Sequence, residues 1–264
     1  MEEGITTDAL WLTPGQKNGK FLMESREIFN DYSSSDFHGI FIPEIPYQFI
    51  KRFAENSGWI WDPFAGNDTT YYVAKKLGIE NRVIRSDINP LNSDIIQGDA
   101  EFFNPLPYTH NNKLHLVFVH PPYWNRIKYS DKEGDLSNLP RLEDYYAKMY
   151  RIAKNIYQYV EEKGYVILVC GNIWYDDEEI DLGVLVKEEF RKAGFKSRSH
   201  IIKDYGETKG NVYGKNYHLW YYRNLKNDTN FFYGDNIFIL KKLWIIQNGV
   251  DDYWWQNLNV TSVS

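Results

Sequence analysis

The 264-residue sequence has a single cysteine, Cys170, so it can form neither an internal disulfide bond nor a cysteine-based metal site. It also lacks any apolar run near the roughly 20 residues that a membrane-spanning helix requires. Its first residues, MEEGITTDALWLTPGQ, are acidic and lack the basic and apolar regions of a signal peptide. We therefore expect a cytoplasmic protein without a membrane anchor or a bound metal.

Positive charge is also in short supply. The chain has 30 lysines and arginines against 36 acidic residues, a net charge of −6. This balance argues against indiscriminate binding of nucleic acid, which depends on cations that neutralise phosphates, but it leaves room for a local basic face. The composition, 43% hydrophobic and 25% charged, is that of a globular protein with one large domain, or one domain and an appendage.

From residue 45 onward, strand-like and helix-like segments alternate. Strands are expected at 58–64, 82–90, 94–100, 113–123 and 165–172, helices at 45–54, 68–78, 141–164 and 182–195, and an antiparallel strand pair at 196–205 and 216–225. Such alternation predicts an α/β fold with an open, mostly parallel sheet covered by helices on both faces. Ligands of such sheets bind at the carboxyl ends of the strands.

The residues from Lys226 onward fall outside this alternation and are rich in aromatic side chains. We therefore expect a main domain over residues 1–225 and a small C-terminal extension over residues 226–264.

Acidic residues stand at the ends of three successive expected strands. The first, Asp62, lies in WDPFAGNDTT, where Gly66 permits a close backbone approach and the following helix offers free amide donors. The stretch has neither the lysine of a P-loop nor a GxGxxG pattern. Asp87 ends the next strand, where a carboxylate usually accepts hydrogen bonds from ribose hydroxyls, and Asp99 ends the third. Three acids suit a cationic, ribose-bearing cofactor better than an anionic dinucleotide.

Two motifs carry a resemblance to a known family. DPFAGNDTT resembles the DPFxGxGTT cofactor motif of the amino-group DNA methyltransferases, and HPPYW resembles their catalytic motif, (D/N/S)PP(Y/F/W). The motifs occur in this order, 58 residues apart (120 − 62). Residues 37–53, IKYS with GDLSNL, and HLWYYRN resemble further segments of the family, so the resemblance covers roughly residues 36–225. Asn67, Asp68 and His120 depart from the usual pattern.

The resemblance implies a Rossmann-like class I methyltransferase fold, a mostly parallel seven-stranded sheet with an antiparallel C-terminal strand. It implies S-adenosylmethionine as the cofactor. The residues that would contact this cofactor are Phe37, Asp62, Phe64, Gly66, Thr69, Asp87 and Asp99.

The second motif implies methyl transfer to an exocyclic amino group, N6 of adenine or N4 of cytosine, in DNA. That nitrogen is a poor nucleophile because its lone pair is conjugated into the ring, and hydrogen-bond acceptors around it favour the form that can attack. The acceptors here would be His120, whose imidazole can accept when neutral, and the carbonyl of Pro121. Pro122 fixes the backbone, and Tyr123 would stack on a flipped base. Trp124, Arg126 and Lys128 are candidate substrate contacts.

Two other functions fit the same motifs. One is methylation of an RNA base, at guanine N2 or adenine N6, although the residues before the expected core are too few for the usual RNA-binding domain. The other is a catalytically inactive nucleic-acid-binding subunit. If the partner is DNA, as in restriction–modification systems, the regions 171–215 and 226–264 are short for target recognition. A specificity partner or a homodimer would then contribute.

Overall fold

The computed structural model describes residues 10–11, 29, 42–54, 57–204 and 234–243. Its strands form an eight-stranded sheet and a two-stranded hairpin, β7–β8. In chain order the strands are β1 (Leu10–Trp11), β2 (Trp59–Asp62), β3 (Val83–Asp87), β4 (Ile96–Gln97), β5 (Leu114–Val119), β6 (Val160–Cys170), β7 (Ile173–Tyr175), β8 (Glu178–Ile180), β9 (Lys196–Asp204) and β10 (Gly234–Lys241).

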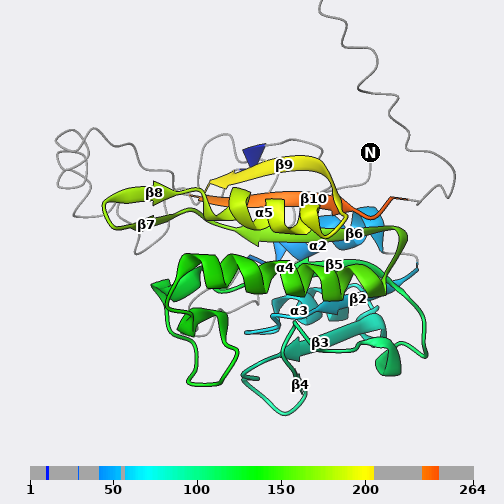
Figure 1. Ribbon diagram of the computed structural model, residues 1–264. Helices are drawn as coiled ribbons and strands as arrows, with labels where there is room; N and C mark the ends of the chain where they lie inside the picture. Colours follow the sequence, from blue (N-terminus) through cyan, green and yellow to red (C-terminus); the bar gives the residue numbers. More distant parts are fainter. Residues whose placement is uncertain (1–9, 12–28, 30–41, 55–56, 205–233, 244–264) are drawn as a thin grey trace, which may run out of the picture.

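The strand order of the large sheet is β1-β9-β10-β6-β5-β2-β3-β4 (Figure 1). Strands β2 to β6 pair in parallel, whereas β10 runs antiparallel to both of its neighbours, β6 and β9. From β4 to β9 this is the seven-strand order of the Rossmann-like class I methyltransferases, and it confirms the fold class expected from the sequence. Strand β1 adds an eighth member by pairing in parallel with β9.

Helices cover both faces of this sheet. They are α2 (Glu44–Phe53), α3 (Thr69–Lys76), α4 (Leu142–Tyr159) and α5 (Leu182–Lys192), with short 3₁₀ turns η1 (Glu80–Arg82), η2 (Leu106–Tyr108), η3 (Trp124–Arg126) and η4 (Leu136–Asn138). Buried residues of α4 and α5 belong to one apolar cluster and those of α2 and α3 to another. The sheet therefore separates two cores, as a doubly wound fold requires.

Strand β5 shows how the sequence supplies both cores. Its run LHLVFV is apolar at nearly every position, as is usual for a parallel strand covered on both faces. Because neighbouring side chains point to opposite faces, Leu116 and Phe118 join the α2–α3 core, and Val117 and Val119 join the α4–α5 core. Packing against both cores therefore holds β5 in place up to the residue before His120.

The long helix ends earlier than its sequence pattern predicts. Helix α4 stops at Tyr159, and the residues expected to complete it, 160–164, begin β6. Val160 is fully buried and pairs with Leu114 of β5, while the amide of Lys163 donates to the carbonyl of Lys242 at 2.9 Å. Sheet pairing at this position outweighs local helix propensity.

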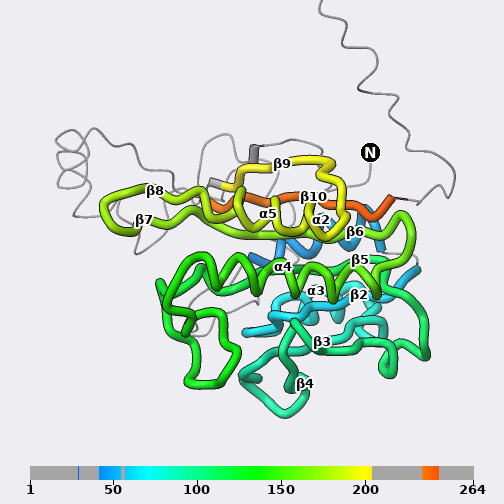
Figure 2. Tube along the Cα trace, in the orientation of Figure 1, coloured from blue at the N-terminus to red at the C-terminus, as the bar shows by residue number. Residues whose placement is uncertain are grey.

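The sheet also includes part of the segment assigned above to a C-terminal extension. Figure 2 shows β10 (orange) beside β9 (yellow), and its residues 234–241 pair with both β6 and β9. Seven of its eight residues are buried, so the domain extends at least to Lys241 and does not end at residue 225. The strand expected at 216–225 lies outside the described residues, and the antiparallel partner of β9 is β10.

In the described part of the chain no helix has both the length and the apolar character needed to cross a membrane.

Candidate active site

A cavity of about 240 Å³ lies at the carboxyl ends of β2, β3, β4 and β5. It is lined by the turn after β2, the residues after β3, the HPPY segment after β5 and the loop that precedes α4. Helix α4 contributes Lys148 and Ile152, and β10 contributes Asp235. Because parallel strands end at one edge of the sheet, motifs far apart in the sequence meet here. Of the residues expected to form the site, Phe64, Gly66, Thr69, Asp87, Asp99, His120, Pro121, Pro122, Tyr123 and Arg126 line this cavity.

Asp62 lies beneath the turn and does not line the cavity. It is 2% exposed, and its carboxylate accepts hydrogen bonds from the amide of Phe64 at 3.1 Å and the hydroxyl of Thr70 at 2.6 Å. These two bonds join the end of β2 to the first turn of α3. Burial raises the pKa of Asp62 to about 7, although both hydrogen bonds oppose the shift. Asp62 therefore stabilises the conformation of the turn between β2 and α3.

This buried carboxyl gives the protein a testable pH dependence. Since the pKa of Asp62 rises from 3.8 to about 7 on folding, the folded state holds the proton more tightly. The contribution of Asp62 to stability is then greatest below pH 4 and is lost as pH rises through 7. An Asp62→Asn variant does not titrate here, so its stability relative to the wild type is expected to rise by roughly 4 kcal/mol between pH 4 and pH 8. Urea unfolding of both proteins across this range measures the difference, and a pH-independent difference contradicts the assignment.

Asp87 is held at the cavity wall by two backbone amides. Its carboxylate accepts from the amide of Gly66 at 2.9 Å and from that of Asn89 at 2.8 Å. Burial is the largest influence on its pKa, which is raised from the usual value. A carboxylate offers about four lone-pair sites, so Asp87 can still accept from two hydroxyl groups of a ligand.

Asp68, which departs from the family pattern, does not line the cavity, and an arginine balances its charge. Its carboxylate forms an ion pair with Arg85 at 2.6 Å, and the Arg85 guanidinium lies 3.7 Å from the centre of the Tyr71 ring. Asp68 adopts a left-handed conformation with φ 66°, which aspartate tolerates better than most residues. Asn67 lines the cavity, whereas the charge of Asp68 is balanced by a cation from β3.

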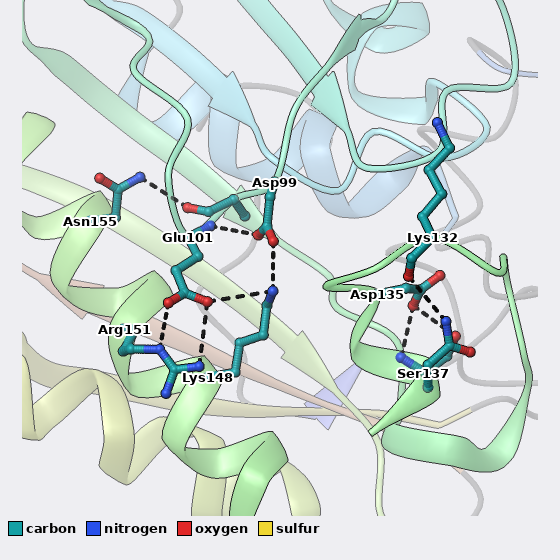
Figure 3. A network of polar contacts seen from close by, with 10 residues as sticks. Asp99, Glu101, Lys132, Asp135, Ser137, Lys148, Arg151 and Asn155 are labelled. Carbon is teal, nitrogen blue, oxygen red and sulfur yellow. Dashed lines mark hydrogen bonds and ion pairs between the residues drawn. The ribbon is translucent and has the colours of Figure 1, made fainter. Parts of the chain in front are cut away.

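Asp99 is paired with a buried lysine that the sequence analysis missed. Figure 3 shows Lys148 between Asp99 and Glu101, with Nζ at 2.6 Å from Asp99 and 3.4 Å from Glu101. The amide of Glu101 donates to the other carboxylate oxygen of Asp99 at 2.9 Å. Lys148 is only 4% exposed, and Arg151 adds an exposed partner for Glu101. The negative charge of Asp99 is therefore balanced by Lys148, and its carboxylate is held in one orientation.

The loop before α4 closes the cavity beside Asp99. Asp135 is buried and accepts from the hydroxyl of Ser130 at 2.5 Å and from the amide and hydroxyl of Ser137 at 2.8 and 2.7 Å (Figure 3). Gly134 has φ +87°, and a Cβ atom there would lie 2.6 Å from Asp99 Oδ2. Only glycine lets the loop approach so closely. The GDLSNL segment therefore closes the cavity beside Asp99.

The HPPY segment places a histidine at the centre of the cavity wall. His120 Nε2 lies 3.2 Å from the hydroxyl of Tyr123, which donates to Asp235 at 2.8 Å. Burial lowers the pKa of His120 from 6.5 to about 4, with a smaller raising effect from Asp235 and a smaller lowering effect from Lys203. The imidazole is therefore neutral at neutral pH and can accept a hydrogen bond.

The two proline carbonyls differ in their hydrogen bonding. The carbonyl of Pro122 accepts from the amide of Trp124 at 2.9 Å and from the hydroxyl of Tyr145 at 2.8 Å. Within the described part of the chain, no hydrogen bond is recorded to the carbonyl of Pro121. The tyrosine from α4 thus fixes the backbone and leaves one carbonyl of the pair available as an acceptor.

Two expected substrate contacts, Trp124 and Lys128, do not line the cavity. Trp124 is 2% exposed, donates from Nε1 to the carbonyl of Leu139 at 2.8 Å and packs edge-on against Tyr175, so it supports the loop and cannot meet a substrate. Lys128 is exposed, does not line the cavity and pairs with Asp131. Phe37 lies outside the described residues.

The strand order is that of the Rossmann-like class I methyltransferase fold, and the cavity lies at the carboxyl ends of its parallel strands. No family model matches the sequence, and no curated protein matches it.

Several solved structures are similar in fold. TrmN from Thermus thermophilus is 15% identical, with a TM-score of 0.45 over 78% of this chain and 50% of that one. TTHA0409, also from Thermus thermophilus, described as a candidate DNA modification methylase and complexed with S-adenosyl-L-methionine, is 17% identical, with a TM-score of 0.36 over 58% and 56%. A SAM-dependent methyltransferase from Archaeoglobus fulgidus is 14% identical, with a TM-score of 0.42 over 76% and 95%. The chain spans about half the length of the first two, and at these TM-scores the likenesses carry no conclusion about its substrate.

Proposed function

We propose that this protein transfers a methyl group from S-adenosylmethionine to the exocyclic amino group of adenine or cytosine in DNA. The observation that carries the proposal is the meeting of two motifs in one cavity. Residues 63–67 of the DPFAGN turn and the HPPY segment line one cavity together with Asp87 and Asp99, although the two motifs begin 58 residues apart (120 − 62). We expect Asp87 and Asp99 to hold a ribose-bearing cofactor and the HPPY segment to hold a flat, amino-bearing base.

The residues present fit the cofactor. Asp87 retains lone pairs for two hydroxyl groups, and Asp99, oriented by Lys148, retains lone pairs for an amino group such as that of adenine. Phe64, Gly66 and Thr69 line the turn between these acids and His120. When bound, S-adenosylmethionine would supply an electrophilic methyl group attached to a positively charged sulfur. A cavity lined by carboxylates favours such a charge.

The chain's own residues would prepare the nucleophile. A neutral His120 can accept one N–H bond from the amino group, and the Pro121 carbonyl can accept the other. Both bonds draw the amino nitrogen out of conjugation and direct its lone pair. The ring of Tyr123 would provide the flat surface for the base, a contact worth roughly 1–3 kcal/mol in proteins that stack single-stranded bases. In duplex DNA the base must first be flipped out.

We expect Arg126 to contact the nucleic acid. Arg126 is exposed and lines the cavity, whereas Lys128 pairs with Asp131. A guanidinium at this position can pair with a phosphate on either side of a flipped base. Sequence recognition would come from other parts of the chain, from a specificity partner or from a second copy of the chain.

Product identification tests this proposal. The purified protein is incubated with S-adenosylmethionine labelled in its methyl group and with duplex DNA, single-stranded DNA or RNA. Each product is then digested to nucleosides and separated. Labelled N6-methyladenine or N4-methylcytosine from DNA is the expected result. Label in RNA alone identifies the RNA methyltransferase, and cofactor binding without transfer to any nucleic acid identifies the inactive subunit.

A further inference from the structure

Among the described residues that line the cavity, three are exposed to solvent: Leu91, Arg126 and Ile127. A side chain that lines a cavity and is also exposed lies where the cavity meets the solvent. Two of these side chains are large and apolar, since Leu91 is 49% exposed and Ile127 is 40% exposed. Removing such apolar surface from water is favourable. A ligand that enters the cavity can therefore gain free energy by covering either side chain.

The loop after the HPPY segment presents Ile127 in a defined conformation. At its start, Nε1 of Trp124 donates to the carbonyl of Leu139 at 2.8 Å. Further along, the amide of Tyr129 donates to the hydroxyl of Ser137 at 3.1 Å. Between these two anchors Ile127 has an extended backbone, with φ −136° and ψ 126°. Isoleucine is branched at Cβ and has few rotamers, so this side chain has little conformational freedom to lose on binding.

The neighbouring charges distinguish Ile127 from Leu91. Ile127 lies between Arg126 and Lys128, both of which are exposed, whereas Leu91 is followed by NSD, which carries no cation. Lys128 pairs with Asp131, but both side chains are exposed and such a pair contributes little. A phosphate can therefore take the place of Asp131. An aliphatic side chain between two cations matches a nucleic acid, in which stacked bases lie between phosphates.

We propose that Ile127 acts as a wedge in duplex DNA. Its side chain enters the base stack at the position that the flipped base has left, and Arg126 and Lys128 bind phosphates on either side of that position. The proposal rests on the proposed function, because it requires that a DNA base enter the cavity. It adds a residue that keeps this base out of the duplex.

The wedge acts on the cost of base flipping. A base that leaves the duplex loses its pairing partner and exposes the faces of the two neighbouring bases. DNA-binding proteins that distort the duplex insert apolar side chains between base steps. Insertion of Ile127 would cover the exposed base faces and remove its own apolar surface from water. The benefit is greatest when the target base is firmly paired, and it is small when that base has no partner.

Two duplexes that differ only opposite the target base test this role. The position that the wild-type protein methylates in plasmid DNA is first mapped by sequencing. Oligonucleotide duplexes with the mapped sequence are then made in two forms. In one the target base is normally paired, and in the other it faces an abasic site, so that the flanking sequence stays double-stranded while the target base leaves the stack readily.

Ile127→Ala is expected to lower kcat/KM for the paired duplex roughly 10-fold or more, because it removes most of the wedge. For the duplex with the abasic site, kcat/KM should stay within about threefold of the wild type. Equilibrium binding of S-adenosylmethionine should be unchanged and shows that the cavity is intact. Ile127→Leu keeps the apolar volume and should retain most of the wild-type activity on the paired duplex.

A fluorescent base analogue at the target position reports flipping without methyl transfer. The analogue is 2-aminopurine for adenine or pyrrolocytosine for cytosine, and its fluorescence rises when it leaves the stack. We expect the wild type to increase the fluorescence of the paired duplex and Ile127→Ala to increase it much less. Ile127→Thr, which keeps the branched shape but replaces apolar surface with a hydroxyl, should behave as Ile127→Ala does and decides the question if the alanine variant fails to fold.

Leu91→Ala is the matched control, since it truncates the other exposed aliphatic side chain of the same cavity. The ratio of its kcat/KM values for the two duplexes should equal that of the wild type. Equal losses on both duplexes in Ile127→Ala, no loss on either, or the same selective loss in Leu91→Ala overturns the proposal. Failure of the proposed function gives a different result, because the wild type would then methylate no base in DNA.

Discussion

A His120→Ala variant is expected to lose methyl transfer by at least ~100-fold, the lower end of the contribution of a positioned proton acceptor. Alanine removes the neutral imidazole and leaves only the Pro121 carbonyl to hold the amino group. The turn after β2, Asp87 and Asp99 are untouched, so the affinity for S-adenosylmethionine should stay within about threefold of the wild type. Transfer of labelled methyl groups to DNA and equilibrium binding of the cofactor measure the two quantities separately.

His120→Asn is the matched control for this experiment. Asparagine occurs at the same position of the motif in the family that the sequence resembles, and its carbonyl oxygen restores an acceptor without a titrating group. It should therefore recover part of the activity that alanine loses. Full activity in His120→Ala would refute the role of the histidine, and loss of cofactor binding in that variant would show a collapse of the cavity instead.

Replacing Lys148 by methionine is expected to lower the free energy of unfolding by about 3–5 kcal/mol, because a buried ion that loses its partner costs about this amount. The substitution preserves most of the side-chain volume but removes the cation between Asp99 and Glu101 from a site that is 4% exposed. Cofactor affinity should also fall, because Asp99 then loses the lysine that holds its carboxylate in one orientation. Urea unfolding at neutral pH measures the stability.

Lys154→Met makes the same substitution on an exposed position of the same helix, α4. It should change the free energy of unfolding by less than ~1 kcal/mol. A second variant, Lys148→Met with Asp99→Asn, removes the unpaired charge and should recover part of the lost stability. If Lys148→Met unfolds at the same urea concentration as Lys154→Met, the buried pair does not contribute as proposed.

The parts of the site that could be predicted from the sequence are those with local patterns. The turn after Asp62 and the two prolines before Tyr123 each follow an apolar strand, and the sheet edge brings such positions together whatever the details of packing. Asp87 could be anticipated for the same reason, because it ends the next strand. These residues line the cavity or support it, and the strand order agrees with the alternation of strands and helices.

The parts that could not be predicted depend on contacts between distant segments. Lys148 lies within a long amphipathic helix, where a lysine ordinarily faces water, and only the packing of α4 against Asp99 buries it. Asp235 precedes the apolar run NIFIL in a segment that was expected to lie outside the main domain, so the place of this strand in the main sheet was missed. Trp124 was expected to contact the substrate but is buried. An aromatic residue beside a motif can face either the ligand or the core, and the sequence does not distinguish the two.

The place of β10 in the sheet affects the stage of synthesis at which the cavity can form. This strand lies between β6 and β9, which precede it in the chain, and it carries Asp235 into the cavity. A growing polypeptide on the ribosome therefore holds β9 and one side of β6 without their partner until residues 234–241 have emerged, and such uncovered strand edges are prone to mispairing. His120 and the turn after β2 are synthesised earlier, whereas Asp235, which lines the same cavity, is synthesised later. The cavity is therefore complete only after residues 234–241 have been synthesised and have paired with β6 and β9.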